Sequence, residues 1–370
     1  MSTDRFRHGA GDLYRALPNI WSAPMDRHMR RKYRDRAPTR LDVMSSIAGP
    51  NPDVLQVLLL TLSEIHPRDE IVFWLLEQNL GPGKIAALER FCAGLGNITL
   101  RPLRIPDAEA FDRLKQLGGK PDSARFLWFV AHQHLPDDIK RVIYLDALDL
   151  LVTDDLVPLL NHPFLGRYLV ACRESLKVPP LLIGPARRAH ALGLPAIIVR
   201  HIAQGLLNSG SIVLNLDKLR RDDIGLDHYL AVAKWARKTL DLDFGDQGLF
   251  SLTHGSHYVQ AHDRYNHRFY NERPGHVMQR PAVIHYAGQV IKPARWRLSP
   301  ELEQRVLEHL QHIGKPEIAL NDWARLPPTH IPYLRKWWDI CARTPCHARI
   351  APQATQRMTR ALARAGVDVD

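Results

Sequence analysis

The sequence has few cysteines and no long apolar run. Its 370 residues include only four cysteines, of which only Cys341 and Cys346 are near neighbours. This scarcity favours a reduced protein over a disulfide scaffold, and there is no Cys/His zinc pattern. No run approaches the ~20 apolar residues that span a bilayer, and the N-terminus lacks the apolar centre of a signal peptide. These absences predict a soluble, cytoplasmic protein.

Acidic residues are outnumbered by basic ones. The chain has 39 Asp and Glu against 50 Lys and Arg, a formal charge of +11, which suits an anionic partner such as nucleic acid, acidic lipid or a nucleotide-linked substrate. No recognised nucleic-acid module is present. The excess gathers in 1–40 and 335–364. A solvated basic face is the commoner reading, but Trp337 and Trp338 beside Arg335 and Lys336 favour peripheral contact with an anionic membrane.

The apolar pattern alternates between strands and helices. Strands are predicted over 41–47, 70–76 and 98–105, and helices over 54–65, 84–94 and 126–134. This order indicates a parallel sheet with crossover helices. Farther along, the sequence predicts an inserted loop with a short helix (184–205), a helix (228–240), two short strands (257–260 and 282–286) and helices after 300.

Two carboxylates interrupt the buried run between Arg141 and Val152. Val142 to Leu145 read as a core strand, and Asp146 and Asp149 follow it. Buried acids need a cation, a hydrogen-bonding ligand or an exit to solvent, and ligands bind at the carboxyl ends of strands in open α/β sheets. The alternative is that both aspartates are solvated turn residues before a helix that starts at 153–155.

Four polar motifs follow one another in a recognisable order. They are Tyr144-Leu-Asp-Ala-Leu-Asp149, Asn208-Ser-Gly-Ser-Ile-Val-Leu-Asn-Leu216, Asp246-Gln247, and His285-Tyr-Ala-Gly288 with Lys292-Pro293. Together they resemble glycosyltransferase family 8, a retaining, nucleotide-sugar-dependent group that contains bacterial lipopolysaccharide galactosyl- and glucosyltransferases and glycogenin. The resemblance runs from about residue 41 to 296.

The resemblance implies a fold and an activity. It implies an α/β GT-A fold, Rossmann-like in its nucleotide half, with a mixed, mainly parallel sheet over 41–297. A basic N-terminal arm (1–40) would precede this domain and a helical, basic C-terminal extension (298–370) would follow it. The implied reaction moves a hexose from a UDP-sugar to a cell-envelope glycan or glycolipid by metal-assisted front-face displacement. The implied location is the cytoplasm, with peripheral contact at the inner face of the membrane.

The resemblance also assigns candidate site residues. Family members bind Mn²⁺ through the Asp-x-Asp carboxylates and the late histidine, which implies Asp146, Asp149 and His285 as ligands for Mn²⁺ or Mg²⁺; hard oxygen donors with an imidazole fit such an ion. The implied donor-binding residues are Arg125, Asp146, Gly288 and Lys292, the last of which pairs with the departing phosphate. The implied catalytic residues are Gln247 beneath the anomeric carbon and Asp246 and Asn208 on the sugar, while Glu174 is the candidate acceptor contact.

Plainer roles stay open for several of these residues. His285 could be a satisfied core histidine, Lys292 a solvated lysine, and Asn208 and Asp246 turn or helix-cap residues. Asp146 and Asp149 are three apart where the family has two, so both reach one ion only through a bulge or turn at 147–148. Residues 48–51 stand where the family holds the nucleotide base. A relative that binds sugar, nucleotide or nucleic acid without catalysis is the alternative function.

Overall fold

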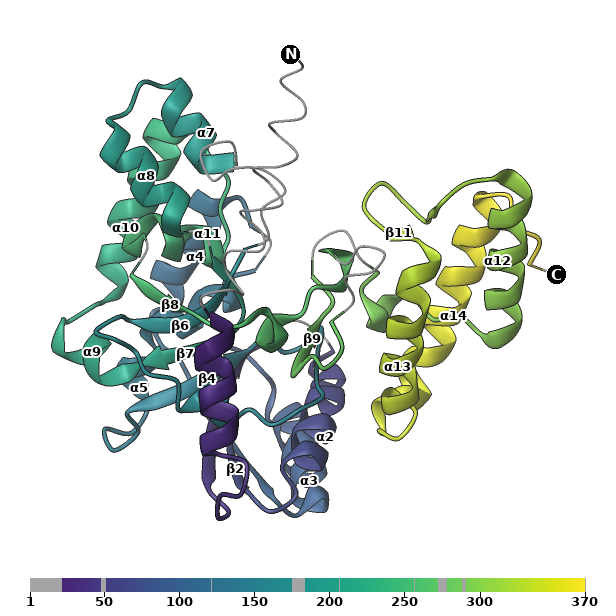
Figure 1. Ribbon diagram of the computed structural model, residues 1–370, viewed down its shortest axis with the longest axis horizontal. Helices are drawn as coiled ribbons and strands as arrows, with labels where there is room; N and C mark the ends of the chain where they lie inside the picture. Colours follow the sequence, from purple (N-terminus) through teal and green to yellow (C-terminus); the bar gives the residue numbers. More distant parts are fainter. Residues whose placement is uncertain are drawn as a thin grey trace.

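The computed structural model describes residues 22–47, 51–120, 122–174, 184–205, 207–255, 257–271, 278–287 and 291–369. A seven-stranded sheet with the order β3-β2-β1-β4-β7-β6-β8 lies at its centre (Figure 1). The strands are β1 (Arg40–Ser46), β2 (Glu70–Glu77), β3 (Ile98–Arg104), β4 (Arg141–Leu145), β6 (Leu169–Arg173), β7 (Leu207–Asn215) and β8 (Tyr258–Gln260). Only β7 runs antiparallel to its neighbours, β4 and β6, so the predicted mixed, mainly parallel sheet is confirmed.

Side-chain alternation along β4 explains the two layers of helices. Val142 and Tyr144 join the core on one face of the sheet, and Ile143 and Leu145 join the core on the other. The first face is covered by α4 (Ala108–Gly118), α10 (Leu226–Trp235) and α11 (Asp246–His254), and the second by α2 (Leu55–Ile65) and α3 (Pro82–Leu95) (Figure 1). Because both faces are covered, β4 is apolar throughout until it ends at the two aspartates.

Two local predictions differ from the structure in detail. Residues 126–134 were expected to form a helix, and they are helical, but 3-10 helix η2 (Ala124–Val130) leads into a short α5 (Ala131–His134). Every residue from Phe126 to Val130 is buried, so no polar face is left for a surface helix. Residues 184–205 were expected to be largely loop, but they form α7 (Gly184–Ala191) and α8 (Ala196–Gly205). Buried side chains spaced three or four apart, such as Val199, Ile202 and Ala203, dock α8 on the core.

The N-terminal basic segment is helical where it is described. Residues 22–32 form a helix that buries Ser22, Asp26 and Met29, and it lies in front of the sheet in Figure 1. The spacing of these three positions puts them on one side of the helix. Arg27 and Arg31 therefore lie on the other side, whereas Arg30 lies near the buried side and binds Asp26.

The C-terminal residues form a helical unit beside the sheet domain. It contains α12 (Pro300–Ile313), the hairpin β10 (Ile318–Ala319) and β11 (Arg325–Leu326), α13 (Ile331–Cys341) and α14 (Cys346–Arg364) (Figure 1). Two basic residues dock it through ion pairs: Arg343 binds Glu64 at 2.7 Å and Arg349 binds Asp53 at 2.6 Å. Part of the basic charge of the tail thus holds the unit to the sheet domain.

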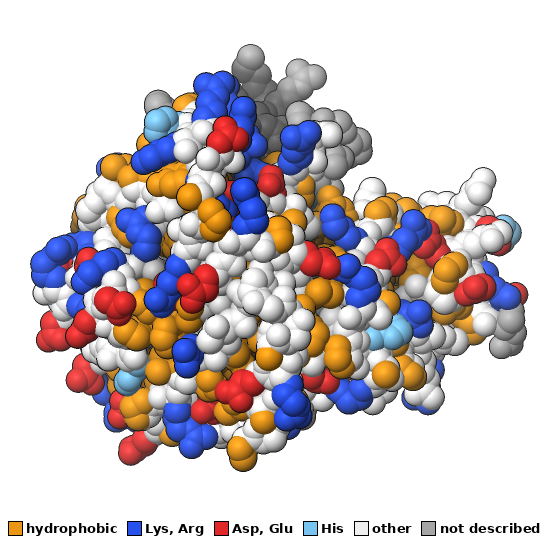
Figure 2. Space-filling model, turned by 90° about the horizontal axis from the view of Figure 1, so that it is seen from below, with side chains coloured by type: hydrophobic (Ala, Val, Ile, Leu, Met, Phe, Trp, Pro, Cys, Tyr) orange, Lys and Arg blue, Asp and Glu red, His pale blue; other side chains and the backbone are white. Residues whose placement is uncertain are grey.

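The tryptophans of this unit are core residues. Trp337 and Trp338 are 1% and 6% exposed, and Nε1 of Trp338 donates to the carbonyl of Trp296 at 2.8 Å. The expectation that this pair anchors a membrane interface is therefore wrong, because their indoles are already packed inside the unit. Acidic and basic side chains are interspersed over the unit in Figure 2. Among the helices of the described residues, none has the length and apolar character needed to cross a bilayer.

Candidate active site

A turn between two strands brings the central aspartates together. β4 ends at Leu145, and β5 (Leu150–Val152) leaves in another direction to pair with β9 (Val283–His285). The amide of Asp146 donates to the carbonyl of Gly210 at 3.0 Å, and the carbonyl of Asp149 accepts from the amide of Tyr286 at 2.9 Å. The extra residue is thus absorbed in the bend at 147–148, as the spacing required, and Leu148 points outward with 40% of its surface exposed.

His285 meets both carboxylates. Its Nε2 lies 3.6 Å from Oδ2 of Asp146 and 3.8 Å from Oδ1 of Asp149, and one ligand atom from each of the three residues lies within 4.8 Å of the others. Nδ1 is bonded to Oδ1 of Asn266 at 2.8 Å. Because an oxygen can only accept, the proton belongs on Nδ1, and the lone pair of Nε2 faces the aspartates.

Burial and charge set different protonation states for these three groups. Burial lowers the pKa of His285 to about 4, so the ring is neutral. Burial and the nearby Asp149 raise the pKa of Asp146 to about 8. Burial alone would also raise the pKa of Asp149, but Lys292 and His285 outweigh it and hold this pKa below its usual value. Without a cation, Asp146 is therefore largely protonated at neutral pH and the charge of Asp149 is balanced by Lys292. A divalent cation would favour the ionised form of both carboxylates.

The donor set fits such a cation. Two carboxylates and one bare imidazole nitrogen are ligands that Mn²⁺ accepts, and Mg²⁺ takes the oxygens. Asn266 supplies the outer contact that fixes the imidazole tautomer, as partners of metal-bound histidines do. The reading of His285 as a plain core histidine leaves its Nε2 unexplained.

Lys292 contacts the same carboxylate. Its ammonium group is hydrogen-bonded to Oδ2 of Asp149 and to the carbonyl of Tyr286, the latter at 2.6 Å. Its side chain is 42% exposed, so the cation sits at the mouth of the site and can reach solvent. Lys292 is thus part of the cluster, in contrast to the solvated-lysine reading.

Glu174 connects two of the other predicted residues. Its Oε2 accepts hydrogen bonds from Nδ2 of Asn208 at 2.8 Å and from Nε2 of Gln247 at 2.9 Å. The buried guanidinium of Arg268 lies 2.9 Å from its Oε1. Asn208 lies within β7, where Oδ1 accepts from Asn266 at 2.7 Å. A continuous chain of contacts therefore links His285, through Asn266, Asn208 and Glu174, to Gln247.

Asp246 lies at the start of α11. Gly245, not Asp246, is the N-cap residue, and Asp246 is the first residue of the helix. Its Oδ2 accepts from Nε1 of Trp128 at 3.2 Å. Burial raises its pKa, while hydrogen bonds from Ser209 and Trp128 act against that rise. Arg125 binds Asp122 at 3.1 Å, and its positive charge also favours the ionised form of Asp246.

The remaining predicted positions fall elsewhere. Gly288 lies outside the described residues, as do residues 48–50 of the region expected to hold the nucleotide base. Asn51 is described, and its Oδ1 accepts from Arg349 of α14 at 2.9 Å. In this structure its side chain thus helps to dock the C-terminal unit.

Sequence reasoning missed Asn266 and Arg268. Both are buried, at 1% and 5% exposure, and both contact predicted site residues. They come from the segment between β8 and β9, which has no recognisable motif. The sequence held no signal for them, because the burial that makes these polar groups need partners is visible only in the structure.

Comparison with known proteins gives a family match over part of the chain, and the fold. Residues 119–297 match the family model described as glycosyl transferase family 8, whereas a search of curated proteins found no match. The solved galactosyltransferase LgtC, in complex with donor and acceptor sugar analogs, is 20% identical with a TM-score of 0.50, over 74% of this chain and 95% of that one.

Two further solved structures give a similar result. An active-site mutant of LgtC is 21% identical with a TM-score of 0.52, over 74% of this chain and 96% of that one. The bifunctional glycosyltransferase WbbM, in its apo form, is 14% identical with a TM-score of 0.52, over 86% of this chain and 51% of that one. At such identities the likeness establishes the GT-A fold, which confirms the predicted fold class. With the match over 119–297, just under half of the chain, these findings support a glycosyltransferase of family 8.

Proposed function

We propose that the protein is a retaining transferase that moves a hexose from a UDP-sugar to a cell-envelope glycan or glycolipid, with Mn²⁺ or Mg²⁺ as cofactor. The observation that carries this proposal is the convergence of Asp146, Asp149 and His285, joined through hydrogen bonds to Asn208, Glu174 and Gln247. Groups suited to a diphosphate and groups suited to a sugar thus share one site.

The leaving-group side of the reaction falls to Asp146, Asp149, His285 and Lys292. Asp146, Asp149 and His285 would hold the cation, which when bound supplies positive charge to the departing diphosphate. Lys292 would exchange its contact with Asp149 for one with a phosphate oxygen once the cation takes over that carboxylate. Arg125, beside the start of α11, would add a contact to the donor.

The sugar side falls to Gln247, Asp246, Asn208 and Glu174. Asp246 and Asn208 would hold hydroxyls of the transferred sugar, and Gln247 would lie beneath its anomeric carbon. The bond from that carbon to the diphosphate oxygen breaks, and a bond to the acceptor oxygen forms on the same face. The acceptor hydroxyl gives its proton to the departing oxygen. Glu174 would contact the acceptor while holding Gln247 and Asn208 in place.

The cellular setting is part of the same proposal. LgtC is a galactosyltransferase solved with donor and acceptor sugar analogs, which supports a hexose donor and a glycan acceptor here, and lipopolysaccharide biosynthesis is the setting that we propose. A charge of +11 supports work in the cytoplasm against the anionic inner face of the membrane.

The test is donor binding and hydrolysis. UDP should bind by calorimetry with Mn²⁺ and not with chelator, and UDP-galactose or UDP-glucose should be hydrolysed only with metal. Asp149→Asn should lower that hydrolysis by about a hundredfold or more, because a ligand of the cation is weakened, whereas Asp227→Asn at an exposed position of α10 should match the wild type. Failure of both metal-dependent binding and hydrolysis would contradict the proposal and favour a chain that binds without turnover.

A further inference from the structure

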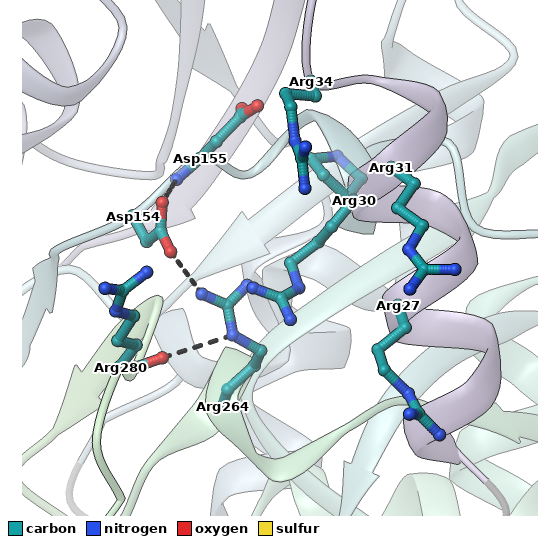
Figure 3. A pocket seen from close by; sticks show the side chains of 9 residues that line it. Arg27, Arg30, Arg31, Arg34, Asp154, Asp155, Arg264 and Arg280 are labelled. Carbon is teal, nitrogen blue, oxygen red and sulfur yellow. Dashed lines mark hydrogen bonds and ion pairs between the residues drawn. The ribbon is translucent and has the colours of Figure 1, made fainter.

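A polar cavity lies away from the candidate active site. It has a volume of about 430 Å³ and is lined by Arg27, Arg30, Arg31, Arg34, Asp154, Asp155, Pro158, Arg264 and Arg280 (Figure 3). In the ladder of β5 and β9, Leu150 pairs with His285 at one end and Val152 with Val283 at the other. Asp154 and Arg280 lie beyond that second end, so the cavity and the aspartate–histidine cluster are at opposite ends of the same ladder.

The aspartates around this cavity are already engaged. Asp154 accepts a hydrogen bond from Arg264, as the dashed line in Figure 3 marks. Asp155 accepts from the amide of Val157 at 2.9 Å and lies 3.4 Å from Arg36. The buried Asp26, behind the wall, binds Nε of Arg30 at 3.1 Å. These acids balance Arg30 and Arg264, and among the described residues none supplies a counter-charge to the other four lining arginines.

Those four arginines surround the cavity from two segments. Arg27, Arg31 and Arg34 follow one another along the N-terminal helix and the turn after it, and Arg280 precedes β9. Their side chains form no ion pair or hydrogen bond with any described residue. Like charges four apart on a helix repel one another. All four are exposed, so water screens part of this repulsion, and an anion between them would remove the rest.

A buried donor at the base of the cavity also lacks an acceptor. Arg264 is 3% exposed, and within the described part of the chain its Nη1 donates no hydrogen bond. Oδ1 of Asp26, 4.0 Å away, is beyond hydrogen-bonding distance. Buried donors rarely lack an acceptor, because a donor that loses its water without gaining a hydrogen bond raises the free energy of the folded state. Nη1 of Arg264 and the four arginines without a partner among the described residues belong to the same cavity.

We propose that this cavity is a binding site for a phosphorylated ligand that carries two or more negative charges. The guanidinium fork binds phosphate oxygens in pairs, and a single carboxylate would balance only one of the four free arginines. The volume is within the ~300–1,000 Å³ range of small-ligand sites. The helix that carries Arg27, Arg30 and Arg31 lies outside residues 119–297, so the site is not contained in the region that matches the family.

The experiment uses inorganic pyrophosphate and the full chain. Titration in chelator keeps the probe from binding through a metal at Asp146 and Asp149. The wild type should bind with an affinity that falls as salt rises. Arg34→Glu with Arg280→Glu should weaken binding by about tenfold or more, because two charge-assisted contacts become repulsive. Arg90→Glu with Arg113→Glu, an equal charge change at exposed positions of α3 and α4, should bind as the wild type does.

Vesicle binding distinguishes a lipid headgroup from a free phosphate compound as the ligand of this cavity. A lipid phosphate would be supported if the wild type sediments with phosphatidylglycerol vesicles but not with phosphatidylcholine vesicles, and if only the Arg34/Arg280 variant loses this binding. Loss confined to pyrophosphate binding would support a free one. The proposal is overturned if both double variants lose binding equally, or if the wild type binds neither probe. Thermal unfolding checks that each variant is folded. If the Arg34→Glu with Arg280→Glu variant does not fold, Arg34→Gln with Arg280→Gln replaces it.

Discussion

Gly210 and His285 face each other so closely that a Cβ atom at position 210 would lie 2.1 Å from Cε1 of the imidazole. Both backbones are fixed, since the carbonyl of Gly210 accepts from the amide of Asp146 at 3.0 Å and the amide of His285 donates to His267 at 2.9 Å. Neither residue can move aside without breaking a contact of the site. The glycine of the Asn-Ser-Gly motif therefore makes room for the histidine of a distant motif.

Gly210→Ala should displace the imidazole. We expect Mn²⁺ affinity to fall by about tenfold or more, and the free energy of unfolding to fall by about 1–3 kcal/mol because the core is overpacked. Calorimetric titration with Mn²⁺ and urea denaturation measure the two effects. Gly83→Ala is the control, because a Cβ atom there meets nothing within 4 Å. Mn²⁺ binding by Gly210→Ala at wild-type strength would remove His285 from the proposed ligand set.

Lys292→Ala should separate cation binding from turnover. The lysine shares the carboxylate of Asp149, so its removal frees a ligand for the cation but takes a positive charge from the diphosphate. At pH 8 we expect Mn²⁺ to bind at least as tightly as in the wild type, while kcat/KM for donor hydrolysis falls by about a hundredfold.

The same titrations provide the control for Lys292. Lys140→Ala changes a lysine that is 60% exposed and contacts Asp217 and the carbonyl of Asp137 at the surface, and it should leave both values unchanged. A Lys292→Ala protein that no longer binds Mn²⁺ would mean that the lysine holds the cluster together, and its role at the phosphate would have to be abandoned.

The part of the site that follows β4 could be predicted, because the end of a buried strand can be recognised in the sequence. Val142 to Leu145 form an apolar run that can only be buried, so the acids after it had to lie at the edge of the sheet. The spacing of Asp146 and Asp149 demanded a bend at 147–148, and the chain bends there. His285 and Gln247 were placed by motif order alone.

Other contacts could not be predicted because they join segments with no shared pattern. Arg268 binds Glu174 from 94 positions away in the chain, and nothing in its neighbourhood indicates a buried cation. Trp337 and Trp338 stand beside basic residues as interface anchors do, yet a helical unit closes over them. A tryptophan pair beside basic residues has the same composition at a membrane interface and in a protein core, and only the surface against which the indoles pack differs.

Asp69 should govern the acid stability of the sheet domain. It accepts from Nη1 of Arg36 at 2.6 Å, from the amide of Thr39 at 2.9 Å and from Nδ1 of His66 at 3.0 Å. Burial alone would raise the pKa of Asp69, but these bonds lower it to about 2. Because the pKa is depressed on folding, the stabilisation is complete above the usual value near 4 and is lost as pH falls from about 4 to about 2.

Asp69→Asn should therefore remove this pH dependence. At pH 7 the variant should lose about 2–4 kcal/mol of unfolding free energy, because the mostly buried Arg36 keeps its charge with only the longer contact to Asp155, at 3.4 Å, to balance it. Between pH 4 and pH 2 its stability should fall less steeply than that of the wild type. Asp217→Asn, which breaks an exposed pair with Lys140, should cost less than about 1 kcal/mol. Parallel acid titrations of wild type and Asp69→Asn would contradict the assignment, since another carboxylate would then control the transition.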